Sequence, residues 1–333
     1  MEPVLAGLYV PLITPLRADG ELATDALEAL AHSVIDAGAA GLVALGTTGE
    51  PATLSAGERH AVLDVCARVC RERSAMLIAG AGSNDTHASL QALRDLAAWP
   101  EVSAALVTVP YFTRPSEEGV VAHFTRLAAG SPVPLIVYNI PHRTGQAVRW
   151  PALRRLADLD GISGVKQAVG DIDEDTVRFM ASLPDGFAVL AGDDLFASAL
   201  LALGAAGAIL ASAHLATDRW VALVGSWRAG EAGRARALGH QLTALSAALF
   251  AEPNPTVIKA VLHAQGRIPS AAVRLPLLPA SPGATRTALR HATDLEDRAA
   301  PAAHYADKLA GREGIRLADL DAALDRIDAD DGR

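Results

Sequence analysis

A lysine that closes a short apolar run is the residue of this sequence best suited to covalent chemistry. Lys166 ends the stretch GISGVK, 161–166. Because side chains alternate along a strand, we expect one side of this strand to carry Ile162, Gly164 and Lys166. If that side faces the core, Gly164 leaves space beneath the lysine. A buried amine is neutral more often than one in water, and the neutral form attacks carbonyl carbons. Lys166 is therefore a candidate for a Schiff base with a carbonyl substrate; the alternative is a strand-end lysine that points into solvent.

A glycine-flanked pair of threonines could bind an anion. The stretch GTTGE, 46–50, follows an apolar run and precedes a helical pattern, so the N–H groups of Thr47 and Thr48 would point out of a turn. Such turns bind carboxylates or phosphates, and the threonine hydroxyls add hydrogen-bond donors and can relay protons. A plain turn without a ligand is the alternative interpretation.

The stretch YNIPHRTG, which begins at Tyr138, places a phenol and a guanidinium after another apolar run. A tyrosine hydroxyl near an imine carbon can move protons, directly or through a threonine. Arg143 is a planar, permanently charged group suited to a carboxylate, although a surface salt bridge is the alternative. We expect His142 to be a loop residue and the acidic pair 193–194 to cap the following helix.

Short apolar runs bounded by glycine alternate with longer amphipathic segments, at roughly the spacing that a strand–helix unit needs. Eight such units predict an α/β fold, a (β/α)₈ barrel with a C-terminal helical region. In such a barrel, catalytic groups lie at the carboxyl ends of the strands, where all the motifs above fall. The expected strands are 7–13, 41–46, 75–82, 103–110, 134–140, 161–166, 187–193 and 206–212, and the expected helices include 24–37, 55–72, 84–98, 116–129, 172–183 and 193–204.

Beyond the repeating units the pattern becomes helical. We expect the barrel to cover 1–228 and a helical region to cover 229–299, with helices at 232–250, 254–266 and 284–298. Residues 300–333 are expected to form an extra helical or mobile extension. A doubly wound open sheet is the alternative fold, but no strand leads into a G-x-G-x-x-G turn.

The bulk composition favours a soluble enzyme without identifying its substrate, and the low cysteine content fits the cytoplasm. The 333 residues are half apolar and carry a formal net charge of −9, which argues against nucleic-acid and anionic-membrane partners. The cysteines, Cys66 and Cys70, are spaced for neither a redox pair nor a zinc site. Neither a signal peptide nor a membrane-spanning run is evident. Without a metal motif or a nucleotide-binding loop, we expect no metal and no cofactor.

Taken in order, the motifs GTTGE, VPYFTRPSEEG, YNIPHRTG, GVKQA, LAGDD and EPNPTVIKAVL resemble the pyruvate-dependent class I aldolase family of dihydrodipicolinate synthase and N-acetylneuraminate lyase. The resemblance covers about residues 5–298. YNIPHRTG, EPNP and RLPLLP are similar to the synthase branch. The resemblance therefore implies condensation of pyruvate with L-aspartate-4-semialdehyde to 4-hydroxy-tetrahydrodipicolinate, for lysine and diaminopimelate synthesis.

The resemblance also implies a role for each site residue. Lys166 would form the imine, and Thr47 and Thr48 would hold the pyruvate carboxylate. Tyr138 would shuttle protons together with Thr47, and Arg143 would bind the carboxylate of the semialdehyde. Gly192 and Ile209 match substrate-binding positions, the latter through its backbone carbonyl. The family usually forms homo-oligomers, so a dimer or a tetramer is implied.

The sequence departs from the family pattern at several positions. The usual tyrosine pair reads Tyr111-Phe112, and Phe112 lacks the hydroxyl that would reach across a dimer interface to complete the proton relay. We expect a slower or differently tuned enzyme; a harmless substitution, with water completing the relay, is the alternative. Strand eight carries Leu210 and His214 where the synthases often have Ser and Asn, and residues 300–333 match no part of the family.

The site at which lysine inhibits sensitive members of the family is also altered. An acidic residue of that site is replaced by Ala88, and Arg59 adds positive charge, so we expect little inhibition by L-lysine. The matching positions are Pro51, Ala52, Ala56, Arg59, Asn84, Ala88 and Tyr111.

Two other functions remain open at this point. One is another pyruvate-dependent aldolase or a 2-keto-sugar-acid dehydratase on the same scaffold, which Phe112 and the altered strand eight favour and Arg143 disfavours. The other is a binding or regulatory module that retains pyruvate binding without catalysis. The presence of Lys166, Tyr138 and Thr47 argues against such a module.

Overall fold

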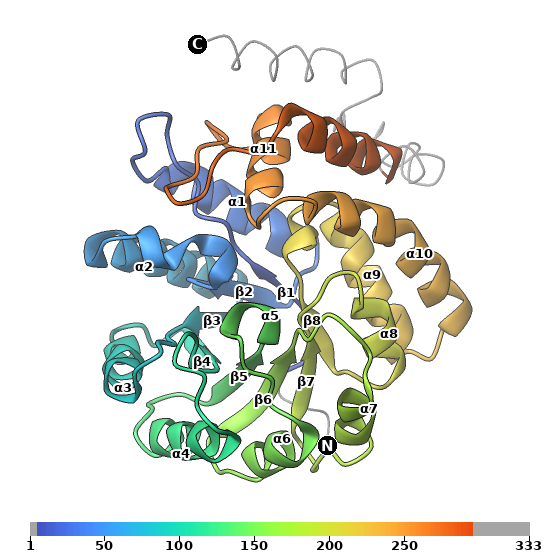
Figure 1. The fold of residues 1–333 in the computed structure, drawn as a ribbon. Coiled ribbons are helices and arrows are strands. Elements are labelled where there is room, and N and C mark those ends of the chain that lie inside the picture. The colour runs from blue at the N-terminus through green and yellow to red at the C-terminus, as the bar shows by residue number, and fades with distance from the viewer. Residues whose placement is uncertain (1–4, 296–333) are drawn as a thin grey trace.

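The protein is a closed barrel of parallel strands surrounded by helices, in a computed structural model that describes residues 5–295 (Figure 1). Each strand pairs in parallel with the next, and the last pairs with the first. The expected (β/α)₈ barrel is therefore confirmed, and the open sheet is excluded. The strands are β1 (Gly7–Pro11), β2 (Gly41–Ala44), β3 (Met76–Gly80), β4 (Val102–Thr108), β5 (Leu135–Asn139), β6 (Ile162–Gln167), β7 (Ala188–Ala191) and β8 (Gly207–Ile209).

Helices follow the strands in the order that the spacing predicts. Most begin and end within a few residues of the expected bounds. The last expected barrel helix starts late, at residue 197 instead of 193, because residues 193–196 form a loop. The barrel helices are α1 (Thr24–Asp36), α2 (Ala56–Arg73), α3 (Thr86–Asp95), α4 (Glu117–Ala128), α6 (Trp150–Ala157), α7 (Glu174–Met180), α8 (Ala197–Ala202) and α9 (Thr217–Arg228), and the short α5 (Pro141–Thr144) directly follows β5.

Side-chain alternation separates an inner core from an outer one. On β1, Tyr9 belongs to the cluster inside the barrel, whereas Leu8 and Val10 belong to the cluster between the barrel and the helices. On β6 the alternation is broken by a register shift opposite β5, so Ile162 joins the outer cluster. The expectation that Ile162 lies on the same side as Lys166 is therefore wrong, because a bulge adds one residue before Gly164.

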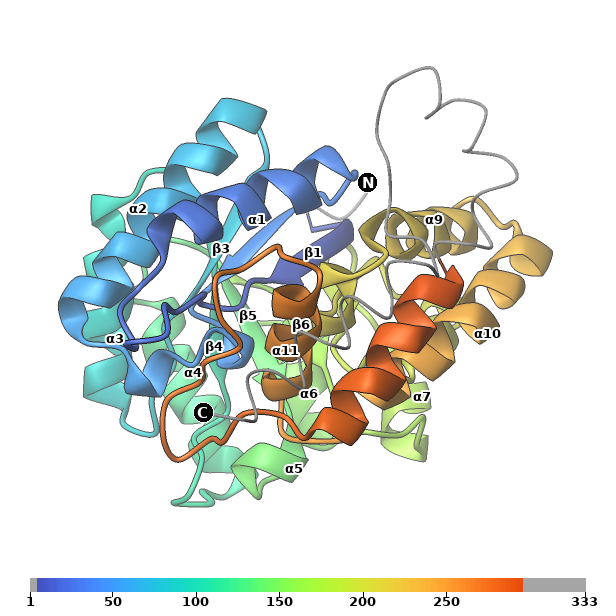
Figure 2. The same cartoon turned by 90° about the horizontal axis from the view of Figure 1, so that it is seen from above.

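The segment after the barrel is helical, as expected. It contains α10 (Ala232–Leu249), α11 (Thr256–Ala264) and a helix that starts at residue 282 and continues to 295, the last residue that the structure describes. Figure 2 shows this last helix beside α10, and the loop that connects it to α11 passing near α1. The division at 228/229 stays a prediction, and the expected extension 300–333 lies outside the described residues.

No helix within residues 5–295 is long and apolar enough to cross a membrane. In the same range, no group of three or more His, Cys, Asp or Glu side chains is arranged to hold a metal ion. Cys66 and Cys70 are free thiols, buried on α2.

Candidate active site

Lys166 and Tyr138 meet inside the barrel. They are paired across β5 and β6, and both side chains are about 95% buried. The Lys166 Nζ lies 4.2 Å from the centroid of the Tyr138 ring, within the range of a cation–π contact. The register of the two strands thus holds an amine and a phenol next to each other.

Two glycines shape the space around Lys166, and they act differently from the expectation. A Cβ at Gly192 would lie 2.5 Å from Lys166 Cγ and 2.8 Å from Cε, so the lysine side chain occupies the space where a larger residue would be. A Cβ at Gly164 would instead lie 2.6 Å from the backbone oxygen of Ala188 on β7. Gly164 therefore permits close approach of two strands, and Gly192 is the residue that makes room for the lysine.

Thr47 and Thr48 begin a 3₁₀ turn, Thr47–Gly49, directly after the glycine that follows β2. The N–H groups of the next two residues close this turn on the carbonyls of Gly46 and Thr47, at 2.8 and 3.2 Å. The N–H groups of Thr47 and Thr48 lead the turn and have no partner within it. Two donors are thus available to an anion at the barrel mouth.

The hydroxyl of Thr48 is oriented by a residue far away in the sequence. The Asn254 side chain donates from Nδ2 to Thr48 Oγ1 over 2.9 Å, and both residues are buried. Because Oγ1 accepts this bond, the O–H of Thr48 remains able to donate to a ligand. The Oδ1 atom of Asn254 is also buried and has no partner among the described residues.

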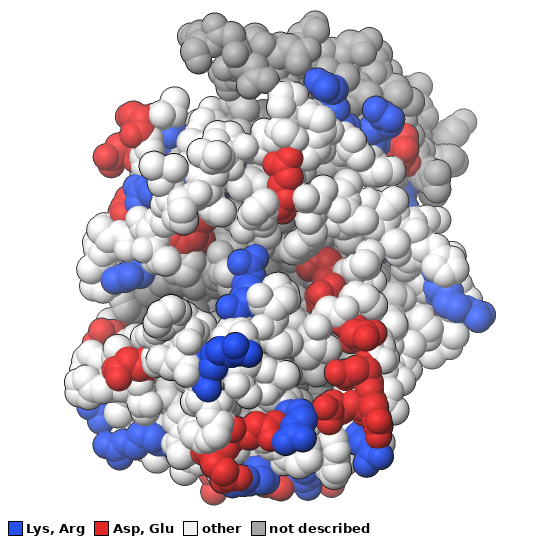
Figure 3. All heavy atoms as spheres, in the orientation of Figure 1, with Lys and Arg blue, Asp and Glu red and all other residues white. Residues whose placement is uncertain are grey.

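A cavity of about 790 Å³ opens from the barrel mouth. Thr47, Tyr138, Arg143 and Tyr111 line it. Arg143 reaches it from α5, where its own side chain is exposed. Figure 3 shows this face of the molecule, with charged groups of both signs around a hollow.

The cavity extends away from the barrel into a groove between α2 and α3. This part is lined by Ala56, Leu63, Ala88, Asp95 and Trp99. Asp95 is on the same helix as Ala88, seven residues later, which corresponds to about 10 Å along the axis. All the residues expected at a lysine site line this cavity except Asn84.

The remaining expected site residues are divided between the interior and the surface. Ile209 is fully buried in the inner cluster that contains Tyr138. Lys166, Gly192, Thr48 and Ile209 are not among the residues that line the cavity. Phe112 is 87% exposed and Tyr111 is 42% exposed, so within one chain the Phe112 ring lies away from the buried amine.

Asp194 is a buried acid that does not cap the next helix, so this expectation is wrong. Its Oδ1 instead accepts a 2.6 Å hydrogen bond from the N–H of Ser212, just after β8. Helix α8 begins after Phe196 without a side-chain cap. Burial raises the pKa of Asp194 to about 6, while the charge of Lys166 acts in the opposite direction. The sequence does indicate a site residue here, because the acidic pair follows β7 at the end of the barrel where site residues lie.

His214, one of the departures in strand eight, joins the ends of β1 and β8. Its Nε2 accepts from the N–H of Ile13 over 3.0 Å, and its Nδ1 lies 2.7 Å from the carbonyl oxygen of Ala211. This pair of partners requires the neutral ring with the proton on Nδ1. Burial lowers the pKa of His214 to about 4, in agreement with that form.

A buried ion pair beside the threonine turn was missed altogether. Glu50, the last residue of GTTGE, contacts Lys259 of EPNPTVIKAVL, and both side chains are almost fully buried. A lysine within the apolar helix TVIKAVLHA was a signal of a buried charge, because a solvated lysine would not be surrounded by apolar neighbours. Its partner, 209 residues away, could not be identified from local pattern.

Comparison with known proteins agrees with this arrangement. A model of the dihydrodipicolinate synthetase family matches residues 4–293. The 4-hydroxy-tetrahydrodipicolinate synthase of Moorella thermoacetica is 40% identical over 279 residues, 84% of this chain and 93% of that protein.

Two solved structures are similar over 87% of this chain. One is the chloride-inhibited dihydrodipicolinate synthase of Acinetobacter baumannii complexed with pyruvate, with a TM-score of 0.83, 34% identity and 99% of that chain covered. The other is the same type of enzyme from Cyanidioschyzon merolae with lysine bound, with a TM-score of 0.82, 30% identity and 97% covered. By sequence and by fold, this chain belongs to the dihydrodipicolinate synthetase family.

Proposed function

We propose that this protein condenses pyruvate with L-aspartate-4-semialdehyde to 4-hydroxy-tetrahydrodipicolinate through a Schiff base on Lys166. The observation that carries the proposal is the Lys166 amine, buried inside the barrel against Tyr138. A buried amine beside a phenol is suited to imine chemistry, in which a nucleophile and a proton carrier must act on the same carbon. Membership in the family supports the choice of substrates.

In the proposed mechanism, the Lys166 amine attacks the carbonyl carbon of pyruvate and water leaves, which forms the imine. A methyl proton is then removed, and the resulting enamine attacks the aldehyde carbon to form the new carbon–carbon bond. Attack on the imine by the amine of the second substrate returns the lysine to its free form. Tyr138, with Thr47, would carry the protons that these steps move, since both line the same cavity.

Two anion-binding elements would orient the substrates. The N–H groups of Thr47 and Thr48, with the Thr48 hydroxyl left free to donate, suit the pyruvate carboxylate. Arg143 lines the cavity on another side, where its guanidinium could bind the carboxylate of the semialdehyde.

The decisive test is borohydride reduction in the presence of pyruvate, followed by peptide mass spectrometry. We expect a reduced pyruvate adduct on Lys166 in the wild type and none in Lys166→Ala. A wild-type protein that is not modified would exclude the imine mechanism and favour a binding module. A coupled assay with aspartate semialdehyde then tests the second substrate. Trapping without turnover of that aldehyde would favour another pyruvate aldolase or a dehydratase.

We also propose that the enzyme is insensitive to L-lysine. The groove between α2 and α3 has Ala88 where an acid would hold the lysine ammonium, and Arg59 adds a like charge to its lining. Two acids flank Ala88 along this helix, and both already have partners. Asp85 caps the helix by accepting a hydrogen bond from the N–H of Ala88 over 2.6 Å, and Asp95, two turns further along, accepts one from Gln91 over 2.8 Å.

A homo-oligomer in the cytoplasm is the proposed form of the protein. Support comes from the exposed apolar side chains that a soluble monomer would leave in water, among them Tyr111, Phe112, Leu275 and Leu278. Light scattering during size-exclusion chromatography would distinguish a dimer or a tetramer from a monomer, and a monomer at assay concentration would contradict this part of the proposal.

A further inference from the structure

A fully buried lysine on α11 lies outside the barrel and has no part in the chemistry described so far. Lys259 is 0% exposed, and its Nζ contacts Glu50 Oε1 and donates to the carbonyl oxygen of Ala272 over 2.9 Å. The side chains of this ion pair are 1% and 3% exposed, so neither charge reaches water. Removing a charge from water is unfavourable, so each charge of the pair must be matched by close partners.

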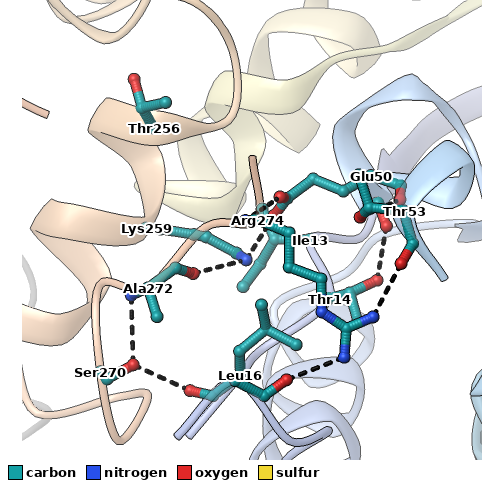
Figure 4. A network of polar contacts seen from close by, with 12 residues as sticks. Ile13, Thr14, Leu16, Glu50, Thr53, Thr256, Lys259, Ser270, Ala272 and Arg274 are labelled. Carbon is teal, nitrogen blue, oxygen red and sulfur yellow. Dashed lines mark hydrogen bonds and ion pairs between the residues drawn. The ribbon is translucent and has the colours of Figure 1, made fainter. Parts of the chain in front are cut away.

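Glu50 ends the threonine turn and uses both carboxylate oxygens. Oε1 contacts Lys259, and Oε2 accepts from the N–H of Arg274 over 3.1 Å. Its backbone is left-handed, with φ of 52°, a conformation that is unfavourable for a residue other than glycine. This strained position is held by Lys259 and Arg274, which belong to the C-terminal segment, here residues 254–274 (Figure 4).

The guanidinium of Arg274 extends the same set of contacts. It donates to the carbonyl oxygen of Thr53 and to that of Gly20, each over 2.8 Å, and it pairs with Glu58. The loop that follows β2 is therefore connected to the C-terminal segment by the carboxylate of Glu50 and by the carbonyl of Thr53.

A second connection reaches the same turn from the start of α11. Asn254 precedes this helix and donates to Thr48 Oγ1, while Lys259, one turn into the helix, pairs with Glu50. Helix α11 and the residue just before its start thus hold Thr48 and Glu50, which are two positions apart. Movement of α11 or loss of the ion pair would change where the N–H groups of Thr47 and Thr48 point.

We propose that Glu50 and Lys259 are a positioning pair that fixes the threonine turn in the geometry needed to bind the pyruvate carboxylate. The inference rests on the proposed function, in which this turn holds that carboxylate. It adds to the binding site for pyruvate a buried ion pair that joins the threonine turn to α11.

Three variants test the pair. Glu50→Gln keeps the shape of the side chain and an acceptor for Arg274 but leaves the Lys259 ammonium without its counter-charge. Lys259→Met keeps the length of the side chain and removes the charge. Ile258→Ala is the matched control, since Ile258 is a fully buried neighbour on the same helix that belongs to the apolar core and not to the polar contacts with the turn.

The readout is the pyruvate concentration that gives half-maximal borohydride trapping, together with KM for each substrate, at a temperature where circular dichroism shows every variant folded. We expect Glu50→Gln and Lys259→Met to raise both KM for pyruvate and the pyruvate concentration for half-maximal trapping about 10-fold or more. The kcat at saturating pyruvate should fall less than about 3-fold, because the lost interaction stabilises the bound substrate and the transition state equally. KM for the aldehyde should change less than about 2-fold. The control should lower stability and leave all these constants unchanged.

If a single variant does not fold, the double variant Glu50→Gln, Lys259→Met replaces it, because removing both buried charges is often neutral for stability. Its pyruvate constants should still be raised, since Met cannot donate to the glutamine. Folded variants with wild-type pyruvate constants would overturn the positioning role and leave the pair purely structural. Absence of any pyruvate adduct in the wild type would instead overturn the proposed function, and this inference with it.

Discussion

Replacing Gly192 by alanine should disable the buried lysine without touching it chemically. The new Cβ would lie 2.5 Å from Lys166 Cγ, whereas carbon atoms in contact are about 3.5–4.0 Å apart. The overlap is therefore about 1 Å or more, and it falls near the root of the side chain, so the amine must move with the rest of the chain. Gly192 is not in the left-handed region, so backbone strain does not contribute. A misplacement of about 1 Å can cost about 100-fold in rate, or about 2.7 kcal/mol in the transition state.

The assay compares kcat/KM and the rate of borohydride trapping with pyruvate in the wild type and in Gly192→Ala. Both should fall about 100-fold in the variant. Gly57→Ala is the matched control, since a methyl group at that helical position meets nothing within 4 Å and should leave activity unchanged while stabilising α2 by up to about 1 kcal/mol. Trapping and turnover within about 3-fold of wild type in Gly192→Ala would refute the argument that this glycine shapes the lysine.

Three further perturbations test other parts of the site. Phe112→Tyr should raise kcat, by up to about 100-fold if the missing hydroxyl is needed for the relay, and an unchanged kcat would make that hydroxyl irrelevant. L-Lysine should inhibit weakly in the coupled assay, and half-inhibition below about 1 mM would contradict the altered groove. His214→Asn should lower the free energy of unfolding, measured by urea titration, and the loss should be largest at neutral pH. His214 is neutral in the folded state with a pKa of about 4, so its stabilisation is complete above the unfolded pKa of about 6.5 and is lost as pH falls toward 4. The stability difference between wild type and variant should therefore shrink by up to about 3 kcal/mol between pH 7 and pH 4, and a constant difference would contradict the neutral buried ring.

The barrel could be predicted from the sequence because its signals are local. Apolar runs bounded by glycine mark the strands, and their regular spacing is that of strand–helix units. The bulge that turns Ile162 outward could not be predicted, because it depends on the register between β5 and β6, which alternation within one strand does not encode.

The site could be predicted in part, for a similar reason. Lys166 and Tyr138 end strands, and the ends of parallel strands meet at one face, so their proximity follows from the fold. Asp194 also follows a strand, but whether its carboxylate caps the next helix or bonds to Ser212 depends on the path of the β7–α8 loop. The partners of Glu50 and Thr48 are more than 200 residues away, and no periodic pattern identifies such pairs.

These distant contacts divide the proposed site between two parts of the chain. The strands hold the amine and the phenol on residues that are paired directly across β5 and β6. The threonine turn is only a single 3₁₀ turn, and a segment this short has few internal hydrogen bonds. Its geometry must then come from outside, and it is supplied by Lys259 on α11 and by Asn254, which lies just before that helix. Substitutions in α11 that never contact a substrate should accordingly change pyruvate binding, whereas the intrinsic reactivity of Lys166 should depend mainly on β5, β6 and Gly192.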